Sequence, residues 1–467
     1  MLALTVLVRL IGITRPLLGN FATRNVVYGM IARNWARGIA DLWHPTVDML
    51  QGGQRSLILL DFPVSAYATA GLWKLCGGPL DVWGRATSVA FSVASVALVY
   101  LYVRRRHGTV AAAGAAFALA VSPVGVVYGQ SFMLEASLVC FTLGAFYALD
   151  RWLAAARTGW LLALGTCLAL LLLTKVYMAV VLLPLAATGF RSARPHGASG
   201  GWLLAATLGL AVLPAACWYA FAYHAAAPDG PHAGQVYFSV RRSAGDHFPP
   251  HPLLGSSDFY RRVLDDLTGV VLTPIGFAFA LAGLSDRRWR QHGVWLAATA
   301  VLVLVLPRKF YEMNYYYLAA LPPLCVLAGL GWQVFQQRVR PAKAAVGLTL
   351  AAALLFSFRY ALKPAFVTPE EDRGVIAAAE TIRALTAEDE PVVTVHGTTI
   401  DLLYYCDRPG WALDPEDPQL PEMLGRCRRE GARYAAIVGS APMLQGLVAC
   451  GNNYRIHRLP APATRDR

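Results

Sequence analysis

Long apolar runs separated by short basic loops are the feature that most restricts the fold of this sequence. A helix of about 20 apolar residues crosses a bilayer, and in lipid every backbone polar group must be paired within the protein. The runs predict a polytopic α-helical membrane protein with about 11 spans. The predicted spans cover residues 2–13, 82–103, 111–128, 132–153, 160–173, 177–190, 202–223, 270–284, 294–306, 315–332 and 344–360.

Composition and charge support lipid as the surroundings of these helices. Only 15% of the residues are charged and 56% are hydrophobic, whereas an ordinary globular domain has about a quarter of its residues charged. In a soluble protein the net charge of +13 would suggest nucleic acid as a partner. The positive residues instead cluster in short loops such as residues 104–106, as cytoplasmic loops do. We therefore expect membrane lipids as partners, and no nucleic acid.

Two apolar segments near the N-terminus are not ordinary spans. Residues 2–13 are short, contain Arg9 and lack a small-residue cleavage site. We expect a retained first span, with a basic leader missing from the sequence, rather than a cleaved signal peptide. Residues 64–78 are apolar but contain Lys74, which favours an interfacial or re-entrant helix.

The polar segment 14–63 is far longer than the turns that join helices in a bundle. We interpret it as the first external loop, and residues 225–267 as the second. Over residues 25–40 apolar side chains recur every fourth position, with Arg33 and Arg37 on the other side. This pattern predicts a helix lying in the membrane interface with its arginines turned to lipid headgroups. Such a helix either only anchors the loop or carries part of the chemistry.

Three aspartates of the first loop are candidates for a general base. Asp61 is followed by a phenylalanine and a proline that opens an apolar segment. It is therefore either a helix cap or a base held at the positive end of a helix dipole. Asp48 is the second candidate and Asp41 the third. Arg24, at the start of the predicted helix, can hold a phosphate together with backbone N–H groups, and Arg55 is a further cation for it.

Four residues outside this loop are further candidates. Glu135 opens a predicted span, where it is either a dipole cap or a carboxylate that faces the same external cavity as Asp61. Lys175 separates two apolar runs, so it either reaches to the surface or neutralises a lipid-linked phosphate from within. Asn314 and Tyr315 lie at the outer end of a span. They either belong to an aromatic belt at the membrane interface or line the active site.

The composition becomes that of a soluble domain in the C-terminal part. We expect a transmembrane domain over residues 1–361 and a small extracytoplasmic α/β domain over residues 362–467. Because it has no glycine-rich nucleotide motif, packing or acceptor gripping is favoured over catalysis. Three of the eight cysteines lie in this domain, and two of them can form a disulfide if the domain lies outside the cytoplasm. The cysteine spacing does not resemble a zinc site. The pattern predicts helices over residues 375–385 and 420–430 and strands over 391–396, 434–439 and 454–459.

The order of these features resembles the GT-C membrane glycosyltransferases. The similarity is greatest to the bacterial branch related to protein O-mannosyltransferases and lipid A aminoarabinose transferases, and it covers most of residues 1–361. It rests on TRNVVYGMIARN, DFPVSAYATAGLWKLCGGPLDVWGR, YGQSFMLEASLVCFTLGAFYALDRW, LLLTK and NYYYLAALPP. YYCDRPGWAL and GARYAAIVG are similar to the periplasmic domains of that branch. Two departures occur: GNFATRN lacks the common first-loop acidic pair, and Asn314 replaces a frequent histidine.

The resemblance implies a glycosyltransferase of the bacterial cytoplasmic (inner) membrane. It would move a hexosyl or pentosyl group from a polyprenyl-phosphate donor to a hydroxyl of a lipid, glycan or protein acceptor on the outer face. Asp61 and Glu135 match acidic positions of the family, which implies an inverting reaction with Asp61 as general base and Glu135 orienting acceptor or sugar. Arg24 and Lys175 would hold the phosphate. No resident cofactor is expected, and a divalent metal has no support in the sequence.

Two other classes of function are alternatives. A transporter or flippase of a lipid-linked saccharide would also need cations in a membrane cavity, but such proteins often have internal repeats and the two halves of this chain show none. A receptor or an assembly scaffold would need no buried ionisable cluster.

Overall fold

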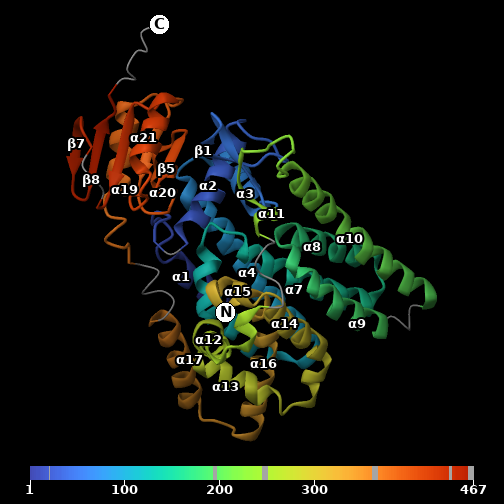
Figure 1. Cartoon of the computed structure of the whole chain (residues 1–467). Helices are drawn as coiled ribbons and strands as arrows, with labels where there is room; N and C mark the ends of the chain where they lie inside the picture. Colours follow the sequence, from blue (N-terminus) through green and yellow to red (C-terminus); the bar gives the residue numbers. More distant parts are fainter. Residues whose placement is uncertain (20, 193–196, 244–250, 360–366, 441–443, 461–467) are drawn as a thin grey trace.

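A bundle of apolar helices carries an eight-stranded sheet at one end (Figure 1). The computed structural model describes residues 1–19, 21–192, 197–243, 251–359, 367–440 and 444–460. In Figure 1 the orange and red C-terminal part lies beside the blue β1 and α2 of the first external loop. The sheet therefore joins segments from both ends of the chain.

Among the described helices, three are long and apolar enough to cross a membrane. These are Leu80–His107 (α4), Glu135–Ala155 (α7) and Ser199–Ala225 within α10 (Gly197–Ala225). Up to five result if each of two bent helix pairs is one span. The predicted number of about eleven membrane spans stays a prediction. The other helices of this part are α1 (Leu2–Leu10), α8 (Thr158–Thr174), α9 (Leu182–Ser192), α12 (Ser257–Asp265), α14 (Gly293–Val305), α15 (Pro307–Glu312), α16 (Leu321–Arg338) and α17 (Lys343–Ser357).

Prolines lie at two sharp bends between helices, one within a predicted span and one at the start of another. Within predicted span 111–128, helix α5 (Thr109–Val121) meets Pro123–Gln130 at 64°. The break lies where Ser122 accepts a hydrogen bond from the Gly125 N–H and Pro123 opens α6 (Pro123–Val127). A second bend, of 106°, separates Ser257–Val271 from α13 (Thr273–Gly283), which has a proline in its first turn. Proline has no N–H, so it starts a new helix more easily than it continues one.

The first external loop is a packed unit. It contains α2 (Ala22–Ala36) and an antiparallel hairpin of β1 (Thr46–Gln51) and β2 (Gln54–Leu59), and α3 (Val64–Cys76) follows it. Two glycines with φ of 58° and 76° form the hairpin turn, which suits a tight connection between strands. The prediction that Arg33 faces lipid headgroups is wrong. Arg33 is buried, because the C-terminal domain covers this side of α2 and receives a hydrogen bond from it.

Strands from three parts of the chain build the sheet. Its order is β3-β2-β1-β5-β4-β6-β8-β7. β3 (Val236–Ser239), from the second external loop, runs parallel to β2. On the other side β1 meets β5 (Gly410–Leu413) through the pair Met49 and Gly410. The remaining strands are β4 (Val392–Val395), β6 (Tyr434–Val438), β7 (Leu447–Gly451) and β8 (Tyr454–Arg458).

Much of the C-terminal part follows its sequence pattern. Helix α19 (Val375–Leu385) has the predicted bounds, and α21 (Leu420–Arg429) and strands β4, β6 and β8 lie within a residue or so of theirs. Helix α20 (Asp401–Cys406) and strands β5 and β7 were not predicted. The division into domains 1–361 and 362–467 stays a prediction, and its boundary lies outside the described residues. The disulfide considered there is not formed, since Cys406, Cys427 and Cys450 are free.

A cluster of charged side chains connects the first loop to the C-terminal part. This junction cluster consists of Arg33, Arg37, Asp48, Arg55 and Asp407. The Arg33 guanidinium contacts Asp48 at 2.6 Å and Asp407 at 3.1 Å, and it donates to the Tyr404 carbonyl. Arg37 binds Asp407 at 2.8 Å and Arg55 binds Asp48 at 3.1 Å. Burial opposes the charge of Asp407, but the two arginines outweigh it and hold its pKa below the usual value.

Glycines let two helices of the bundle approach closely. A Cβ at Gly331 of α16 would lie 1.8 Å from the carbonyl oxygen of Phe279 on α13. A Cβ at Gly283 of α13 would lie 2.2 Å from the carbonyl oxygen of Leu327. Small residues at crossings are how helices pack tightly in membranes, where no hydrophobic force drives them together.

We predict that Gly331→Ala lowers the thermal stability of the purified protein. The new methyl group meets a backbone carbonyl that cannot move aside, so we expect a loss of about 1–3 kcal/mol. Gly347→Ala on α17 is the matched control, because a Cβ there meets nothing within 4 Å. Thermal unfolding in detergent gives the unfolding temperature of each variant. Equal unfolding temperatures for the two variants would contradict the close packing.

We also predict that Arg33→Met destabilises the protein far more than Arg37→Met. Removing Arg33 leaves Asp48 and Asp407 partly uncompensated, and breaking a buried ion pair costs about 3–5 kcal/mol. The Arg37 side chain is 43% exposed, so its loss costs about 1 kcal/mol or less. Unfolding temperatures of the two variants, compared at one pH and salt concentration, test this. Similar small shifts for both would count against the junction cluster as a stabilising contact.

Candidate active site

Lys175 lies at the centre of a buried group of opposite charges. It interrupts the helical path between α8 and the short helix Val176–Val181, and its backbone is extended, with φ −154° and ψ 112°. The residue is 6% exposed. Its ammonium group contacts Asp61 Oδ2 at 2.6 Å and Glu135 Oε1 at 3.7 Å. The inward orientation rules out the interpretation in which Lys175 reaches to the surface.

Backbone hydrogen bonds hold Asp61 beside this lysine. Asp61 follows β2 and is 8% exposed. The next residue, Phe62, donates its N–H to the carbonyl of Leu173 at the end of α8, and Trp218 of α10 donates to the carbonyl of Leu60. The N-cap of α3 is Pro63 and has no side-chain cap. The carboxylate of Asp61 is therefore not a helix cap but a partner of Lys175.

Glu135 is the first residue of α7 and is almost fully buried, at 1% exposure. Two hydrogen bonds connect the segment before Glu135 to α2 and α3. The Phe132 N–H donates to Asn25 of α2, and the Ser65 hydroxyl of α3 donates to the Met133 carbonyl. One oxygen, Oε2, has no hydrogen-bond partner among the described residues. A buried carboxylate oxygen without a partner is costly, so this oxygen is available to a ligand.

Arg24 brings a second cation toward this group from α2. Its guanidinium packs over the ring of Phe238 of β3, at 4.9 Å from the ring centroid. Burial disfavours its charge, but interactions with Tyr315, Tyr28 and Asp61 outweigh this and raise the pKa of Arg24. Two carboxylates and two cations thus lie within electrostatic reach of one another. Such a group can bind an anion and also accept a proton.

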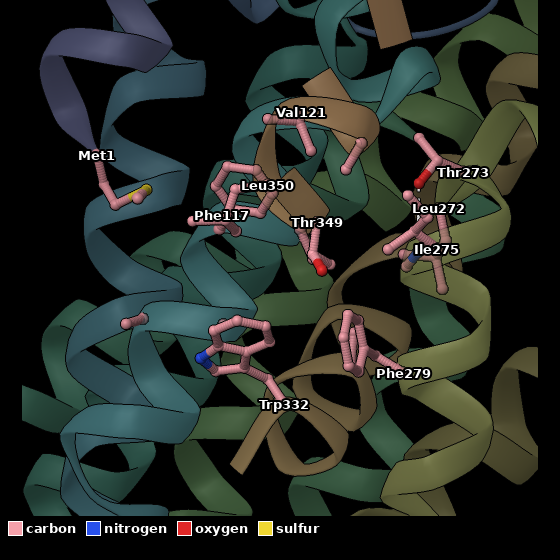
Figure 2. A pocket seen from close by; sticks show the side chains of 16 residues that line it. Met1, Phe117, Val121, Leu272, Thr273, Ile275, Phe279, Trp332, Thr349 and Leu350 are labelled. Atoms are coloured by element: carbon pink, nitrogen blue, oxygen red, sulfur yellow. Dashed lines mark hydrogen bonds between the residues drawn. The ribbon is translucent and has the colours of Figure 1, made fainter. Parts of the chain in front are cut away.

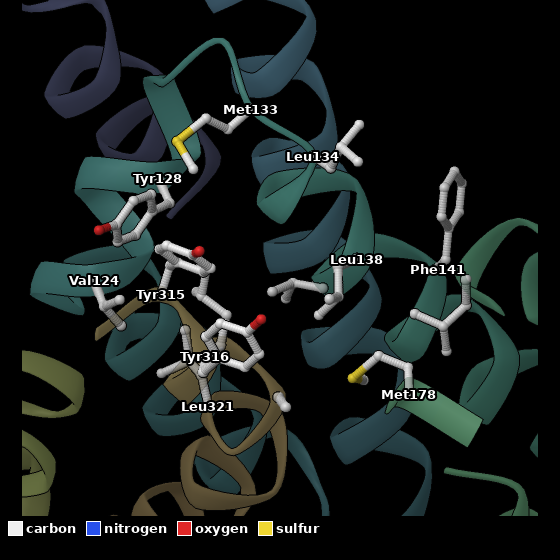
Figure 3. Close-up of a cluster of buried hydrophobic side chains, with 14 of the residues drawn as sticks. Val124, Tyr128, Met133, Leu134, Leu138, Phe141, Met178, Tyr315, Tyr316 and Leu321 are labelled. Atoms are coloured by element: carbon white, nitrogen blue, oxygen red, sulfur yellow. The ribbon is translucent and has the colours of Figure 1, made fainter. Parts of the chain in front are cut away.

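Aromatic side chains line the neighbourhood of these charges. Tyr315 and Tyr316 stack with their ring centroids 5.0 Å apart, and Tyr128 packs edge-on against Tyr315 at 5.7 Å (Figure 3). Tyr177, two residues after Lys175, packs against Tyr316 at 5.0 Å. The hydroxyl of Tyr128 donates to Asn314 Oδ1 at 2.6 Å. Asn314 and Tyr315 thus lie in one buried aromatic wall, rather than in a belt exposed to lipid headgroups.

The structure places two predicted site residues elsewhere. Asp48 and Arg55 belong to the junction cluster, where each oxygen of Asp48 faces an arginine. A carboxylate held in this way is a structural partner and not a free base. Arg55 also lines a polar cleft of about 540 Å³ between the first-loop hairpin and the C-terminal part. Asp41, the third aspartate, is exposed and pairs with His44.

An apolar cavity of about 150 Å³ lies within the helix bundle (Figure 2). Phe117, Leu272, Phe279 and Trp332 are among its lining side chains, and it reaches Met1. Among the described residues no charged side chain lines it, and its apolar walls suit an apolar chain.

Sequence reasoning singled out Tyr315 but assigned no role to two other tyrosines beside the charges, Tyr28 and Tyr219. Tyr28 and Tyr219 each interact with Asp61 and Lys175. The hydroxyl of Tyr219 also accepts the N–H of Val176, which supports the break beside Lys175. Tyr28 lies one helical turn after Arg24 and so shares its face of α2. That spacing in the sequence could have indicated that Tyr28 lies near Arg24. No sequence pattern around Tyr219 indicates that it lies near the site.

The chain is similar to one protein family and to several solved structures. Residues 61–218 match the family model described as dolichyl-phosphate-mannose-protein mannosyltransferase, a range that contains Asp61, Glu135 and Lys175. Comparison with curated protein sequences gives no match. Among solved structures, the chain is similar to ArnT from Cupriavidus metallidurans bound to undecaprenyl phosphate. That match has a TM-score of 0.64 and 16% identity, over 97% of this chain and 96% of that one.

Two further solved structures share the fold. The oligosaccharyltransferase of Archaeoglobus fulgidus in its apo form matches with a TM-score of 0.51 and 14% identity, over 94% of this chain and 69% of that one. The arabinofuranosyltransferase AftD from mycobacteria matches with a TM-score of 0.53 and 14% identity, over 99% of this chain and 41% of that one. These findings show that the chain has the GT-C glycosyltransferase fold that its sequence predicts, and that residues 61–218 are similar to the protein mannosyltransferase family.

Proposed function

We propose that this protein transfers a sugar from a polyprenyl-phosphate donor to a hydroxyl acceptor on the outer face of the bacterial inner membrane. The buried group of Lys175 between Asp61 and Glu135 carries this proposal. A structural or scaffolding protein gains little from such a group, because burying two carboxylates around one lysine is costly unless a ligand uses them.

The cations suit the leaving group of this reaction. When the bond between the anomeric carbon and the phosphate oxygen breaks, negative charge develops on the lipid phosphate. Lys175 and Arg24 can stabilise that charge, so no general acid is needed. The structure of ArnT was solved with undecaprenyl phosphate bound, which supports a polyprenyl phosphate as the lipid part of the donor here.

Asp61 is the proposed general base. It would take the proton of the acceptor hydroxyl while the acceptor oxygen bonds to the anomeric carbon from the side opposite the leaving phosphate, which inverts the configuration. In the ligand-free arrangement Lys175 neutralises Asp61. A donor phosphate would compete for this ammonium group and leave the carboxylate free to accept the proton. Donor binding would thus switch on the base.

Glu135 is placed to orient the sugar or the acceptor. Its Oε2 lacks a hydrogen-bond partner among the described residues, and a sugar hydroxyl would supply one. The acceptor itself is a lipid, a glycan or a protein. An oligosaccharyltransferase of this fold was solved tethered to an acceptor peptide, which keeps a protein acceptor among the three.

We predict that Asp61→Asn lowers sugar transfer by about 10²–10⁴-fold, the usual contribution of a general base. The variant keeps its shape and its hydrogen-bonding capacity, so donor binding should persist. Transfer is measured with the protein in liposomes that contain lipid-linked sugars extracted from the host, with products identified by mass spectrometry.

Asp41→Asn is the matched control, because Asp41 is an exposed aspartate of the same loop, and its activity should equal that of the wild type. Turnover of Asp61→Asn close to the wild-type rate would exclude Asp61 as the base. If the wild type moves lipid-linked sugar across the bilayer without transferring it, the protein is a flippase and the enzyme proposal fails.

We further predict that Arg24→Gln weakens binding of undecaprenyl phosphate by at least about tenfold. A hydrogen bond to a charged group contributes about 1.5–3 kcal/mol, and this variant removes it together with the charge. Native mass spectrometry of the detergent-solubilised protein can measure retained lipid. Arg37→Gln, an arginine of the junction cluster, serves as the control and should bind as the wild type does. Equal retention by Arg24→Gln and the wild type would remove Arg24 from the phosphate site.

A further inference from the structure

A second buried group of ionisable side chains lies in the C-terminal part, on the side of the first loop. Asp372 precedes α19, His396 follows β4, and Asp401 is the first residue of α20. They are 7%, 7% and 0% exposed, respectively. Three separate segments thus bring one imidazole and two carboxylates together at the end of a central strand of the sheet.

The spacing of these side chains fits a bound divalent cation. His396 Nε2 lies 3.0 Å from Asp372 Oδ1 and 3.8 Å from Asp401 Oδ1. One ligand atom from each residue lies within 4.8 Å of the other two. In a tetrahedral zinc site, with bonds of about 2.0–2.1 Å, neighbouring ligand atoms are about 3.3 Å apart. The two distances from His396 Nε2 lie on either side of that value.

The charges of this group are incompletely balanced by the protein. The Asp401 carboxylate faces His396, accepts from Thr399 and from the Leu402 N–H with Oδ1, and has no hydrogen-bond partner for Oδ2 among the described residues. A protonated His396 would neutralise only one of the two carboxylates. A divalent cation bound to a neutral imidazole would neutralise both, and buried charge without such compensation is costly.

The imidazole is also oriented as metal-binding histidines are. The imidazole interacts with the backbone of Val438, while Nε2 faces the two carboxylates. Metal-binding histidines typically donate their second ring N–H to a carbonyl or carboxylate, which fixes the ring and its tautomer.

We propose that Asp372, His396 and Asp401 bind a divalent cation of the zinc type, and that this cation fastens the C-terminal domain to the first external loop. One imidazole nitrogen with carboxylate oxygens is a ligand set that zinc accepts. Asp372 Oδ2 accepts the N–H of Gly19 at 2.8 Å, directly before the helix that carries Arg24. A metal held by Asp372 would thus stabilise the start of that helix. This inference does not depend on the proposed sugar transfer.

Metal content of the full-length protein in detergent tests the proposal. The protein is stripped with EDTA, dialysed, reconstituted with Zn²⁺ alone and freed of excess metal. We expect the wild type to retain one equivalent of zinc per chain more than Asp401→Asn. Zinc should also raise the unfolding temperature of the stripped wild type, but not that of Asp401→Asn. The comparison between the variants excludes zinc bound elsewhere, which both would share.

Asp41→Asn is the matched control, because Asp41 and His44 form an exposed histidine–aspartate pair in the same chain; it should retain as much zinc as the wild type. Equal zinc retention by the wild type and Asp401→Asn would overturn the proposal and leave a histidine–aspartate ion pair only. If Asp401→Asn does not fold, Asp372→Asn takes its place. In that case Co²⁺ added to the stripped wild type is a second measurement. The proposal predicts absorption bands of bound Co²⁺, and their absence would also overturn it.

Discussion

The contact between Lys175 and Asp61 joins parts of the chain that are 114 positions apart. Asp61 ends the first external loop and Lys175 interrupts a hairpin of apolar helices, and a backbone hydrogen bond from Phe62 to Leu173 aligns the two segments. With Glu135 at 3.7 Å from the same ammonium group, three separate segments of the chain meet at one charge. Each region on its own would leave an ionisable group in apolar surroundings. The requirement to compensate these charges therefore determines how the loop lies on the helices.

Charge compensation also holds the first loop against the C-terminal part. The first loop is a helix and a hairpin packed between the bundle and the C-terminal part. Its strands continue the C-terminal sheet, and the junction cluster compensates its buried arginine. Arg24, on the same helix as Arg33, takes its position from this enclosure. The proposed metal group at Asp372 would add a third fastening, at the other end of that helix.

The sequence predicted local features well and long-range partners poorly. Apolar length and flanking charge located most helices, and a proline and a break in hydrophobicity located Asp61 and Lys175. The hairpin was overlooked although two glycines separate two short runs with strand character, a usual turn signal. The burial of Arg33 could not be predicted, because the Tyr404 carbonyl that it binds lies 371 positions away. Helical periodicity records which face is polar, but not whether water, lipid or another part of the protein covers it.

The pairing of β1 with β5 has a consequence for the order in which the molecule is completed. Met49 leaves the ribosome early, whereas its partner Gly410 is made only after all the apolar helices. Until the C-terminal part is made, the hairpin presents an unpaired edge, a surface prone to wrong association. The loop that carries Arg24 thus reaches its final form last. A truncated chain would be distinguishable from a finished one by that open edge.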